Sequence, residues 1–585
     1  MNLTQFIESN ANKFLTRPAI GFKKDDEWKS LSWMDFRRTI YKTANALKNY
    51  GIGPGDRVGI YSDNSAEWVV FDLAALAIGA VTVPLYSTAN EEQIRYILKD
   101  AQVRILLTGN QEQYERSYVL LEEGHIELLI AAKKRTWIKK QNTFYLEDFI
   151  MEASDSLEIE PRDSEDLATL IYTSGTTGVP KGVMLTHGNF TNNINSHFDF
   201  FKFKNFTSEH SLAFLPLTHV FERSWTYLCL TGGAKVTFLE NTTQIASALK
   251  EVKPTMMCAV PRFFQKIYIG VNQKMEESSD LKKKLFHWAL SLGKQKSELR
   301  RDGKNVPLGL QLKYALADRL VFSKIKNQMG GNLWFMPCGG ASISRDVSDF
   351  FDHIGLHLTV GYGLTETTAT VTAMPLEGYK PGSCGILLGG TEINLGEDNE
   401  ILVKGTGVMK GYYNREEETK AVLSEDGWLR TGDQGELRDG HLFITDRLKD
   451  LMKTSNGKYV APQPIENLLS DQPLIASVVL VAENRPFVSA LLVPNFEVLK
   501  PLAEEKGLLG LTEQELCEHP EIKKLMDETV NLAQKNLQGF EKVKKMYLLP
   551  QEFAIESGEM TPTLKIRRKV VLERYADAVE SMYHN

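Results

Sequence analysis

The main constraint on the fold is an alternation of short apolar runs with amphipathic helical patterns, which continues to about residue 360. Strands separated by helices are typical of βαβ units and of a largely parallel sheet. The predicted strands are 57–61, 80–85, 103–107, 167–172, 234–239, 255–260 and 358–360. The predicted helices in this region are 34–49, 91–100 and 345–354. The N-terminal part is therefore expected to be an α/β domain.

The pattern changes twice after this region. Between about 385 and 445 there are short strands and turn pairs such as Asp439-Gly440, which predict a β-rich subdomain. From residue 447 onward, one short helix, two apolar strands and several charged helices follow. We expect an α/β chain with a large N-terminal domain, 1–446, that holds parallel and mixed sheets, helices and the β-rich subdomain. A small, mobile α+β domain, 447–585, completes the prediction.

Composition limits the functional classes. The 585 residues include 68 Lys and Arg against 75 Asp and Glu, so the net charge of -7 gives no basic footprint for nucleic acid. The five cysteines are scattered without a C-x-x-C pair, which favours reduced thiols over disulfides or a zinc site. The N-terminus does not resemble a secretory signal. These features predict a cytoplasmic protein.

Two segments raise the question of membrane contact. The longest apolar region, 68–86, contains Asp72 and Pro84, and it is expected to be a buried helix followed by a strand rather than a membrane span. The segment 281–292 places apolar residues on one helical face and lysines on another. It is interpreted either as a peripheral contact with the anionic inner surface of a membrane or as a helix packed on its own domain. The second interpretation is favoured.

A loop dense in glycine and hydroxyl residues follows the predicted strand 167–172. Its sequence, Thr173-Ser-Gly-Thr-Thr-Gly-Val-Pro-Lys181, offers backbone N–H groups, hydroxyls and one ammonium to anionic oxygens. It departs from the regular phosphate loop, because Pro180 and Gly182 replace the second glycine and the magnesium-binding hydroxyl. The loop therefore favours a nucleotide polyphosphate site that is not of the kinase or GTPase type. A solvated turn with a surface lysine is the alternative.

Five further motifs follow in order: Gly339–Ser342, Tyr362–Thr367, Thr431–Asp433, Asp446–Asp450 and Thr561–Lys565. With these motifs the chain resembles the adenylate-forming (acyl-activating) superfamily over nearly its whole length. Within that superfamily it is most similar to AMP-forming long-chain fatty acid–CoA ligases. Three features suggest this branch: the segment 215–223, a helical insert from about 271 to 330, and Thr563-Leu564 before the terminal lysine.

The resemblance implies a two-step reaction. A fatty acid and ATP would give acyl-AMP and pyrophosphate with Mg²⁺, and the co-substrate CoA would then displace AMP. The expected partners are these small molecules and no nucleic acid. One alternative is an adenylating enzyme that uses a medium-chain or aryl acid or passes its acyl group to an acceptor other than CoA. Another is a nucleotide-binding regulatory protein without catalysis, which the retained charged motif residues disfavour.

The resemblance also assigns residues to the nucleotide. The phosphate loop contributes Thr173, Ser174, Gly175, Thr176, Thr177, Gly178 and the catalytic Lys181. Gly340, Ala341 and Tyr362 are expected beside the adenine, and Gly363 also at the nucleotide. Asp433 is expected at the ribose, and Arg447 at the ribose or the phosphates. Thr365 and the catalytic Glu366 are expected at the nucleotide and its Mg²⁺, since their oxygens suit a hard cation. For Thr365-Glu366 alone, a helix-cap pair is the competing interpretation.

The remaining assignments concern the acid and the second step. Lys565 is expected to be catalytic and to contact the α-phosphate and the attacking carboxylate, whereas His219 is expected to line the acyl pocket without acting as a base. Lys449 is the expected hinge of the mobile domain, and Lys453 and Gly457 are assigned to the thioester step. A solvated tail lysine is the competing interpretation of Lys565.

Overall fold

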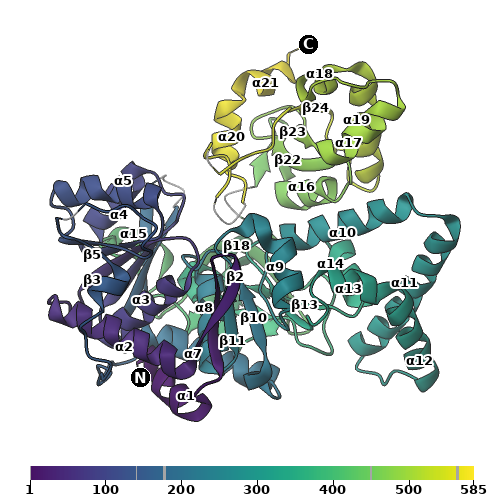
Figure 1. Ribbon diagram of the computed structural model, residues 1–585. Helices are drawn as coiled ribbons and strands as arrows, with labels where there is room; N and C mark the ends of the chain where they lie inside the picture. The colour runs from purple at the N-terminus through teal and green to yellow at the C-terminus, as the bar shows by residue number, and fades with distance from the viewer. Residues whose placement is uncertain are drawn as a thin grey trace.

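The computed structural model describes residues 2–139, 141–174, 179–447, 451–555, 557–561 and 565–584, with the backbone alone for Ser174 and Arg447. Figure 1 shows a large N-terminal body with a smaller C-terminal body above it. Within the described ranges, no helix is both long enough and apolar enough to cross a membrane. The chain has the predicted mixed α/β architecture with a separate C-terminal domain.

One sheet of the N-terminal body has seven strands in the order β7-β6-β5-β3-β4-β8-β9. Its strands are β3 (Arg57–Tyr61), β4 (Val81–Leu85), β5 (Val103–Thr108), β6 (Leu128–Ala131), β7 (Thr143–Tyr145), β8 (Leu167–Ser174) and β9 (Pro180–Thr186). All neighbours are parallel except β8 and β9, which are antiparallel. The associated helices are α2 (Trp33–Asn49), α3 (Ala66–Ala77), α4 (Glu91–Asp100), α5 (Gln111–Glu122) and α6 (Leu146–Phe149). The predicted strands in this region are confirmed within two residues at each end.

A second sheet system is mixed. It consists of β10-β11-β1-β2 and β12-β13-β14-β15, and the segment 255–259 joins the two through isolated bridges to Ser211, Phe335 and Cys338. Its strands are β1 (Pro18–Lys24), β2 (Glu27–Ser32), β10 (His210–Ala213), β11 (Lys235–Phe238), β12 (Phe335–Cys338), β13 (His357–Tyr362), β14 (Thr372–Ala373) and β15 (Ile386–Leu387). The prediction of a regular strand over 255–260 was wrong. Prolines at 254 and 261 bound this segment, and neither can donate to a ladder.

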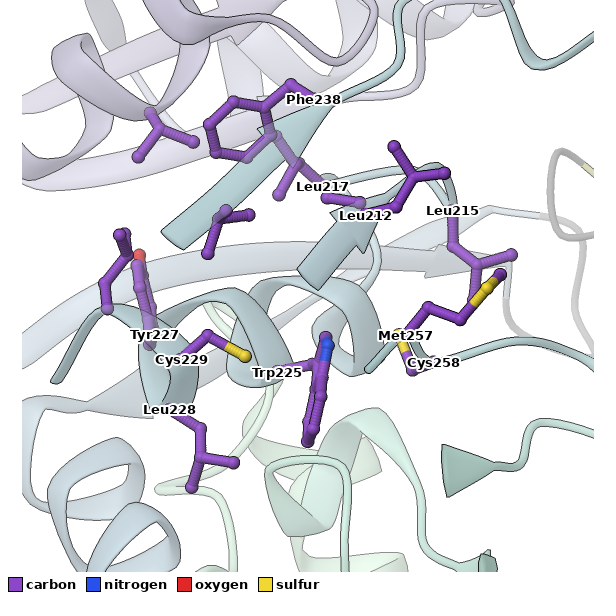
Figure 2. Close-up of a cluster of buried hydrophobic side chains, with 14 of the residues drawn as sticks. Leu212, Leu215, Leu217, Trp225, Tyr227, Leu228, Cys229, Phe238, Met257 and Cys258 are labelled. Carbon is purple, nitrogen blue, oxygen red and sulfur yellow. The ribbon is translucent and has the colours of Figure 1, made fainter. Parts of the chain in front are cut away.

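Two helices lie between the sheets and carry much of the core. They are α7 (His187–Phe201) and α8 (Val220–Thr231), and α1 (Phe6–Phe14) packs against α8. In Figure 2, Leu217 and Phe238 lie on one side of α8, whereas Trp225 and Leu228 leave it on the other side. The apolar content of α8 is therefore divided between two packing layers.

The apolar segment 68–86 is confirmed as the buried helix α3 followed by the buried strand β4. Asp72, which interrupts it, forms a fully buried ion pair with Arg223 of α8. The Arg223 guanidinium also donates to Thr169 (2.8 Å) and to Thr82 (2.6 Å). A buried charge needs such partners, because the desolvation of an unpaired ion costs roughly several kcal/mol of folding free energy.

The predicted β-rich subdomain is an antiparallel sheet in the order β16-β17-β18-β19. Its strands are β16 (Thr391–Leu395), β17 (Glu400–Gly405), β18 (Leu429–Arg438) and β19 (His441–Arg447), and α15 (Glu416–Val422) lies between β17 and β18. Asp439 and Gly440, both with positive φ (48° and 77°), connect β18 to β19 as the turn pair predicted. In Figure 1, β18 of this sheet lies at the top of the N-terminal body, below the C-terminal domain.

The helical insert begins about ten residues earlier than predicted. It contains α10 (Pro261–Glu276), α11 (Asp280–Arg301), α12 (Leu308–Ala317), the π-helical turn η4 (Asp318–Phe322) and α13 (Ser323–Gln328), and α9 (Ile245–Val252) precedes it. Helix α11 buries Phe286, Ala289 and Leu292 and packs against α14 (Arg345–His353). A Cβ at Gly293 would lie 2.2 Å from the His353 carbonyl oxygen, so the contact is close. The favoured interpretation of 281–292, a helix packed on its own domain, is confirmed.

The C-terminal domain has a three-stranded sheet, β22-β23-β24, with a separate apolar cluster on each face. The strands of this sheet are β22 (Ile475–Val481), β23 (Ser489–Pro494) and β24 (Lys545–Leu548). A separate pair is formed by β20 (Met452–Lys453) and β21 (Tyr459–Val460). Its helices are α16 (Pro462–Ser470), α17 (Phe496–Glu505), α18 (Glu513–Glu518), α19 (Pro520–Ala533), α20 (Arg568–Arg574) and α21 (Ala576–Ser581). Because these clusters contain no residue of the N-terminal body, the domain has its own core.

Candidate active site

A cleft with a volume of 1860 Å³ lies between the two domains. The N-terminal wall comes from the carboxyl ends of β8, β12 and β13 and from the loops that follow them. Ligands bind at this edge of open α/β sheets. The C-terminal wall comes from α16 and from the segment around Lys565. The cleft is lined by the following predicted site residues: Thr173, Lys181, His219, Gly340, Ala341, Tyr362, Gly363, Thr365, Glu366, Asp433 and Lys565.

Several predicted residues have no described position in this cleft. Gly175, Thr176, Thr177 and Gly178 lie outside the described residues, as does Lys449. The side chains of Ser174 and Arg447 are likewise outside the description, although Arg447 pairs with Asp433 through the backbone of β19 and β18. Their assigned roles stay predictions.

One end of the cleft joins Lys181 to Glu366 through a tyrosine. Thr173 pairs with Lys181 across β8 and β9, and the Lys181 ammonium lies 5.2 Å from the ring centre of Tyr412. The Tyr412 hydroxyl donates to Glu366 Oε1 at 2.9 Å. Burial and the adjacent Glu366 carboxylate raise the pKa of Tyr412, so its hydroxyl keeps the proton that it donates. A cation, a phenol and a carboxylate are thus arranged around one end of the cleft.

Sequence reasoning missed Tyr412. Its place depends on an isolated bridge between Tyr412 and Val183 of β9, two segments more than 200 residues apart in the chain. The local pattern Gly411-Tyr412-Tyr413 does not indicate this pairing. Only a match of the turn as a whole to related sequences would have drawn attention to it.

The opposite wall joins Tyr362 to Asp433. Tyr362 ends β13, and its hydroxyl donates to Asp433 Oδ2 at 2.8 Å. Two hydrogen bonds fix the turn that carries Asp433: Asp433 N donates to Thr431 Oγ1 (3.1 Å), and Gly432 N donates to Glu400 Oε1 (3.0 Å). The prediction gave Tyr362 only a flat face for adenine. Its hydroxyl also orients the carboxylate that was assigned to the ribose.

Two glycines allow the backbone to approach the cleft closely. Gly340 has a φ of +86°, in the left-handed region that favours glycine. A Cβ at Gly363 would lie 2.0 Å from the Ala369 carbonyl oxygen, which leaves no space for a side chain. Both positions therefore require glycine for structural reasons beside the predicted adenine site.

The pair Thr365-Glu366 begins the 3-10 turn η5 (Thr365–Thr367). Thr367 makes the cap contact, since its Oγ1 accepts a hydrogen bond from Leu364 N at 2.8 Å. The competing helix-cap interpretation of Thr365-Glu366 is therefore wrong, because a neighbouring hydroxyl already satisfies the free N–H. Both residues face the cleft, where their oxygens suit a hard cation such as Mg²⁺.

His219, together with Lys565 of the C-terminal domain, lines one small cavity. This cavity between the domains is lined by His219, Phe221, Val260, Leu215, Gly340 and Lys565. Burial, together with the charge of Lys565, lowers the pKa of His219 to about 3, so the ring is neutral at physiological pH. Its Nδ1 accepts from Phe221 N at 3.2 Å and caps α8, which places the ring proton on Nε2. A neutral ring with its acceptor nitrogen occupied is a poor base.

Contacts between the domains hold Lys565 at the cleft. Asn467 Nδ2 donates to Ser342 Oγ at 2.6 Å, and Gln265 Nε2 donates to Asp471 Oδ1 at 3.3 Å. Two hydrogen bonds link Lys565 to Thr561: Lys565 N donates to Thr561 Oγ1 (3.0 Å), and Thr561 N donates to Lys565 O (2.8 Å). Lys181 and Lys565, which are 384 positions apart in the numbering, therefore line one cleft.

Lys453 and Gly457, assigned to the second step, do not line this cleft. Lys453 N donates to Glu483 Oε2 at 2.8 Å, and its ammonium lies 5.5 Å from the ring centre of Tyr459. Gly457 has a φ of +76° in the turn that follows Thr454. Any part of these two residues in catalysis requires a different orientation of the C-terminal domain.

One turn after His219, Glu222 is fully buried in α8 and holds the segment that precedes the helix. Its Oε2 accepts from Leu215 N at 3.0 Å. Burial raises the pKa of Glu222 to about 8, so the side chain is largely a neutral carboxylic acid at pH 7. The structural role of Glu222 thus depends on its protonation.

We expect Glu222→Gln to raise the melting temperature relative to the parent, and the gain should grow as the pH increases from 5 to 8. In the unfolded chain this carboxyl ionises near its ordinary pKa, whereas the native state keeps the proton up to about pH 8. The contribution of this carboxyl to the free energy of unfolding therefore decreases as the pH rises through that interval. Glutamine does not titrate, so the variant has no such loss. Thermal unfolding of both proteins across this range measures the difference. A difference independent of pH would contradict the prediction.

The comparisons with known proteins agree with this geometry. Residues 7–413 match the family of AMP-binding enzymes, and residues 449–585 match the AMP-binding enzyme C-terminal domain. The chain belongs to the AMP-binding enzyme family and is an adenylate-forming enzyme. It is similar to a long-chain fatty acid–CoA ligase of Mycobacterium bovis, at 33% identity over 96% of this chain and 93% of that protein. A human long-chain fatty acid–CoA ligase is 30% identical over 100% of this chain and 92% of its own length.

Solved structures share the fold. An anthranilate–CoA ligase in complex with anthranoyl-AMP has a TM-score of 0.75 at 18% identity, and the match covers 99% of this chain and 98% of that one. The adenylation domain of a carboxylate reductase from Mycobacterium chelonae has a TM-score of 0.77 at 22% identity, with 100% and 91% covered. At these identities the likeness concerns the fold alone.

Proposed function

We propose that this enzyme activates a long-chain fatty acid to its acyl-AMP and transfers the acyl group to CoA. The observation that carries the proposal is an apolar part of the cleft lining, called here the channel. Its lining includes side chains that are almost completely buried, between α7, α8 and the strands β12 to β14. The apolar members are Phe201, Trp225, Leu228, Phe335 and Ala373, each at most 8% exposed.

This channel suits an extended hydrocarbon chain. Trp225 and Leu228 leave α8 on its lower side in Figure 2, and the Trp225 ring lies 5.9 Å from that of Phe335 in β12. The Trp225 indole N–H donates to Ser211 at 2.9 Å, so its polar atom is satisfied away from the channel. Each methylene group that leaves water for such a wall contributes about 0.8 kcal/mol, which favours long acids over short ones.

In the proposed first step, a carboxylate oxygen attacks the α-phosphorus of ATP and pyrophosphate leaves. Two anions must approach, and unit charges ~4 Å apart repel by ~4 kcal/mol at an effective dielectric near 20. Lys181 and Lys565 would offset this repulsion from opposite walls of the cleft. Thr365 and Glu366 would hold Mg²⁺, which neutralises phosphate charge when it is bound.

In the proposed second step, the CoA sulfur attacks the acyl carbon and AMP leaves. Neither step requires His219 as a base, because a carboxylic acid is already ionised at neutral pH and a free thiol with pKa ~8.5 is partly ionised. The names of the relatives from Mycobacterium bovis and Homo sapiens, both long-chain fatty acid–CoA ligases, support the acid and the acceptor.

The test is AMP release by the purified enzyme with ATP, Mg²⁺ and CoA, across straight-chain acids of about 4 to 18 carbons and aryl acids. We expect kcat/KM to rise with chain length until the channel is filled. Without CoA, the enzyme should release about one pyrophosphate per active site and then stop. A preference for aryl acids, or AMP release that does not depend on CoA, would exclude the proposed function and leave the family assignment intact.

A further inference from the structure

The outer helices of the insert carry a row of exposed leucines. Leu308, Leu312, Leu316 and Leu320 are spaced four residues apart along α12 and η4, and they are 77%, 74%, 52% and 41% exposed. The opposite face of the same helices buries Tyr314, Ala317 and Phe322. In Figure 1, α12 lies at the outer edge of the N-terminal body, away from the C-terminal domain. These four leucines, called here the leucine row, are not required for packing within the chain.

The surroundings of the leucine row are strongly basic. Residues 280–328 contain twelve Lys and Arg but only four Asp and Glu, in a chain whose net charge is -7. Within the part of the chain that the structure describes, six exposed cations of this segment have no carboxylate within the 4.0 Å of an ion pair: Lys282, Lys284, Lys294, Lys313, Arg319 and Lys324. Lys313 and Arg319 belong to the same helices as the leucines. The segment is therefore a cationic region on an acidic protein.

We propose that the leucine row docks on the surface of an anionic lipid bilayer, with the leucines in the acyl boundary and the flanking cations at the headgroups. Helices that lie in a membrane interface combine an apolar face with a basic margin in this way. A second copy of the chain would have to bring the same basic segment against itself around a twofold axis. Like charges would then meet without nearby acids, so the charge favours anionic lipid as the occupant.

Docking of the leucine row would be independent of the acid that the enzyme uses. Helix α10 begins at the cleft, where Pro261, Arg262 and Gln265 line the wall, and it continues to the insert that carries the leucine row. Docking there would leave the C-terminal domain on the side away from the bilayer (Figure 1). The domain could still change its orientation while the enzyme stays bound.

The test is sedimentation of the full-length protein with vesicles of phosphatidylcholine alone or mixed with phosphatidylglycerol. The docking variant is Leu312→Glu combined with Leu316→Glu. The matched control is Leu509→Glu combined with Leu532→Glu, because these leucines are 72% and 73% exposed in the C-terminal domain. We expect the parent and the control to bind the anionic vesicles, and the docking variant to bind at least tenfold more weakly. A second variant, Lys313→Glu with Arg319→Glu, should lose binding to anionic vesicles and reduce the salt dependence.

Each other outcome overturns the proposal. Equal vesicle binding by the docking variant and the parent would place any membrane contact elsewhere. A parent that does not bind vesicles, but is a dimer that the docking variant converts to a monomer, would identify a second copy as the occupant. Thermal unfolding and AMP formation with a short, water-soluble acid should be the same in all variants. This control excludes misfolding as the cause of lost binding.

Discussion

Lys565→Ala is expected to slow the formation of acyl-AMP about a hundredfold or more, because it removes a cation that the C-terminal domain brings to the cleft beside His219 and Gly340. Removal of one preorganised donor from a developing charge typically costs ~2.7–4 kcal/mol. Lys565 lines the same small cavity as His219, which is assigned to the acid, and Gly340, which is assigned to the nucleotide. Because His219 is neutral there, it cannot replace the lost positive charge.

Exchange of labelled pyrophosphate into ATP measures this first step alone. Lys565→Arg should retain part of the rate, since it keeps the charge but changes the donor geometry. Lys524→Ala is the matched control, because Lys524 is an exposed lysine of α19 in the same domain and does not line the cleft. Thioester formation from supplied acyl-AMP should change much less than the exchange rate. Exchange at the parental rate in Lys565→Ala would remove this residue from the proposed mechanism.

The fold could be predicted well from the sequence because local pattern and tertiary environment agree in most elements. Helix α4 has the predicted bounds Glu91–Asp100, since Asn90 and Gln93 form a capping box at its start and apolar residues recur on one face. The prediction of a regular strand at 255–260 failed for a local reason. It rested on the apolar pattern alone and did not take into account the prolines that bound the segment. The start of the helical insert was placed too late, although Pro261 at its first turn is a typical helix start.

The candidate site was less predictable, because its geometry depends on contacts between distant segments. Motif order indicated most of the cleft, yet Tyr412 is brought to Glu366 by a bridge to β9 and by the hydrogen bond from Met409 N to Glu366 O, which join distant segments. Similarly, the hydrogen bond from Tyr362 to Asp433 joins two separate sheets, and neither motif contains information about it. The exposure of the leucine row also could not be predicted from the sequence, since apolar residues at helical spacing are more often part of a core.

Glu366→Gln is expected to lower the rate of acyl-AMP formation about a hundredfold and to raise the Mg²⁺ concentration for half-maximal rate. The change removes the negative charge from an oxygen ligand of the proposed metal site while it keeps the size of the side chain. It also alters the link to Lys181, because the hydroxyl of Tyr412 donates to Glu366 Oε1 and the Lys181 ammonium lies over the Tyr412 ring. Pyrophosphate exchange at a series of Mg²⁺ concentrations measures both effects.

Two further variants separate the charge from its orientation. Tyr412→Phe keeps the ring under Lys181 but removes the hydroxyl, and the loss of a hydrogen bond to a charged group costs about 1.5–3 kcal/mol. We therefore expect a decrease of roughly tenfold to a hundredfold with a smaller change in Mg²⁺ dependence. Glu416→Gln, at an exposed position of α15, should behave as the parent. If Glu366→Gln kept the parental Mg²⁺ dependence, the metal would have to be held elsewhere, and the carboxylate would then serve only to orient Tyr412 beneath Lys181.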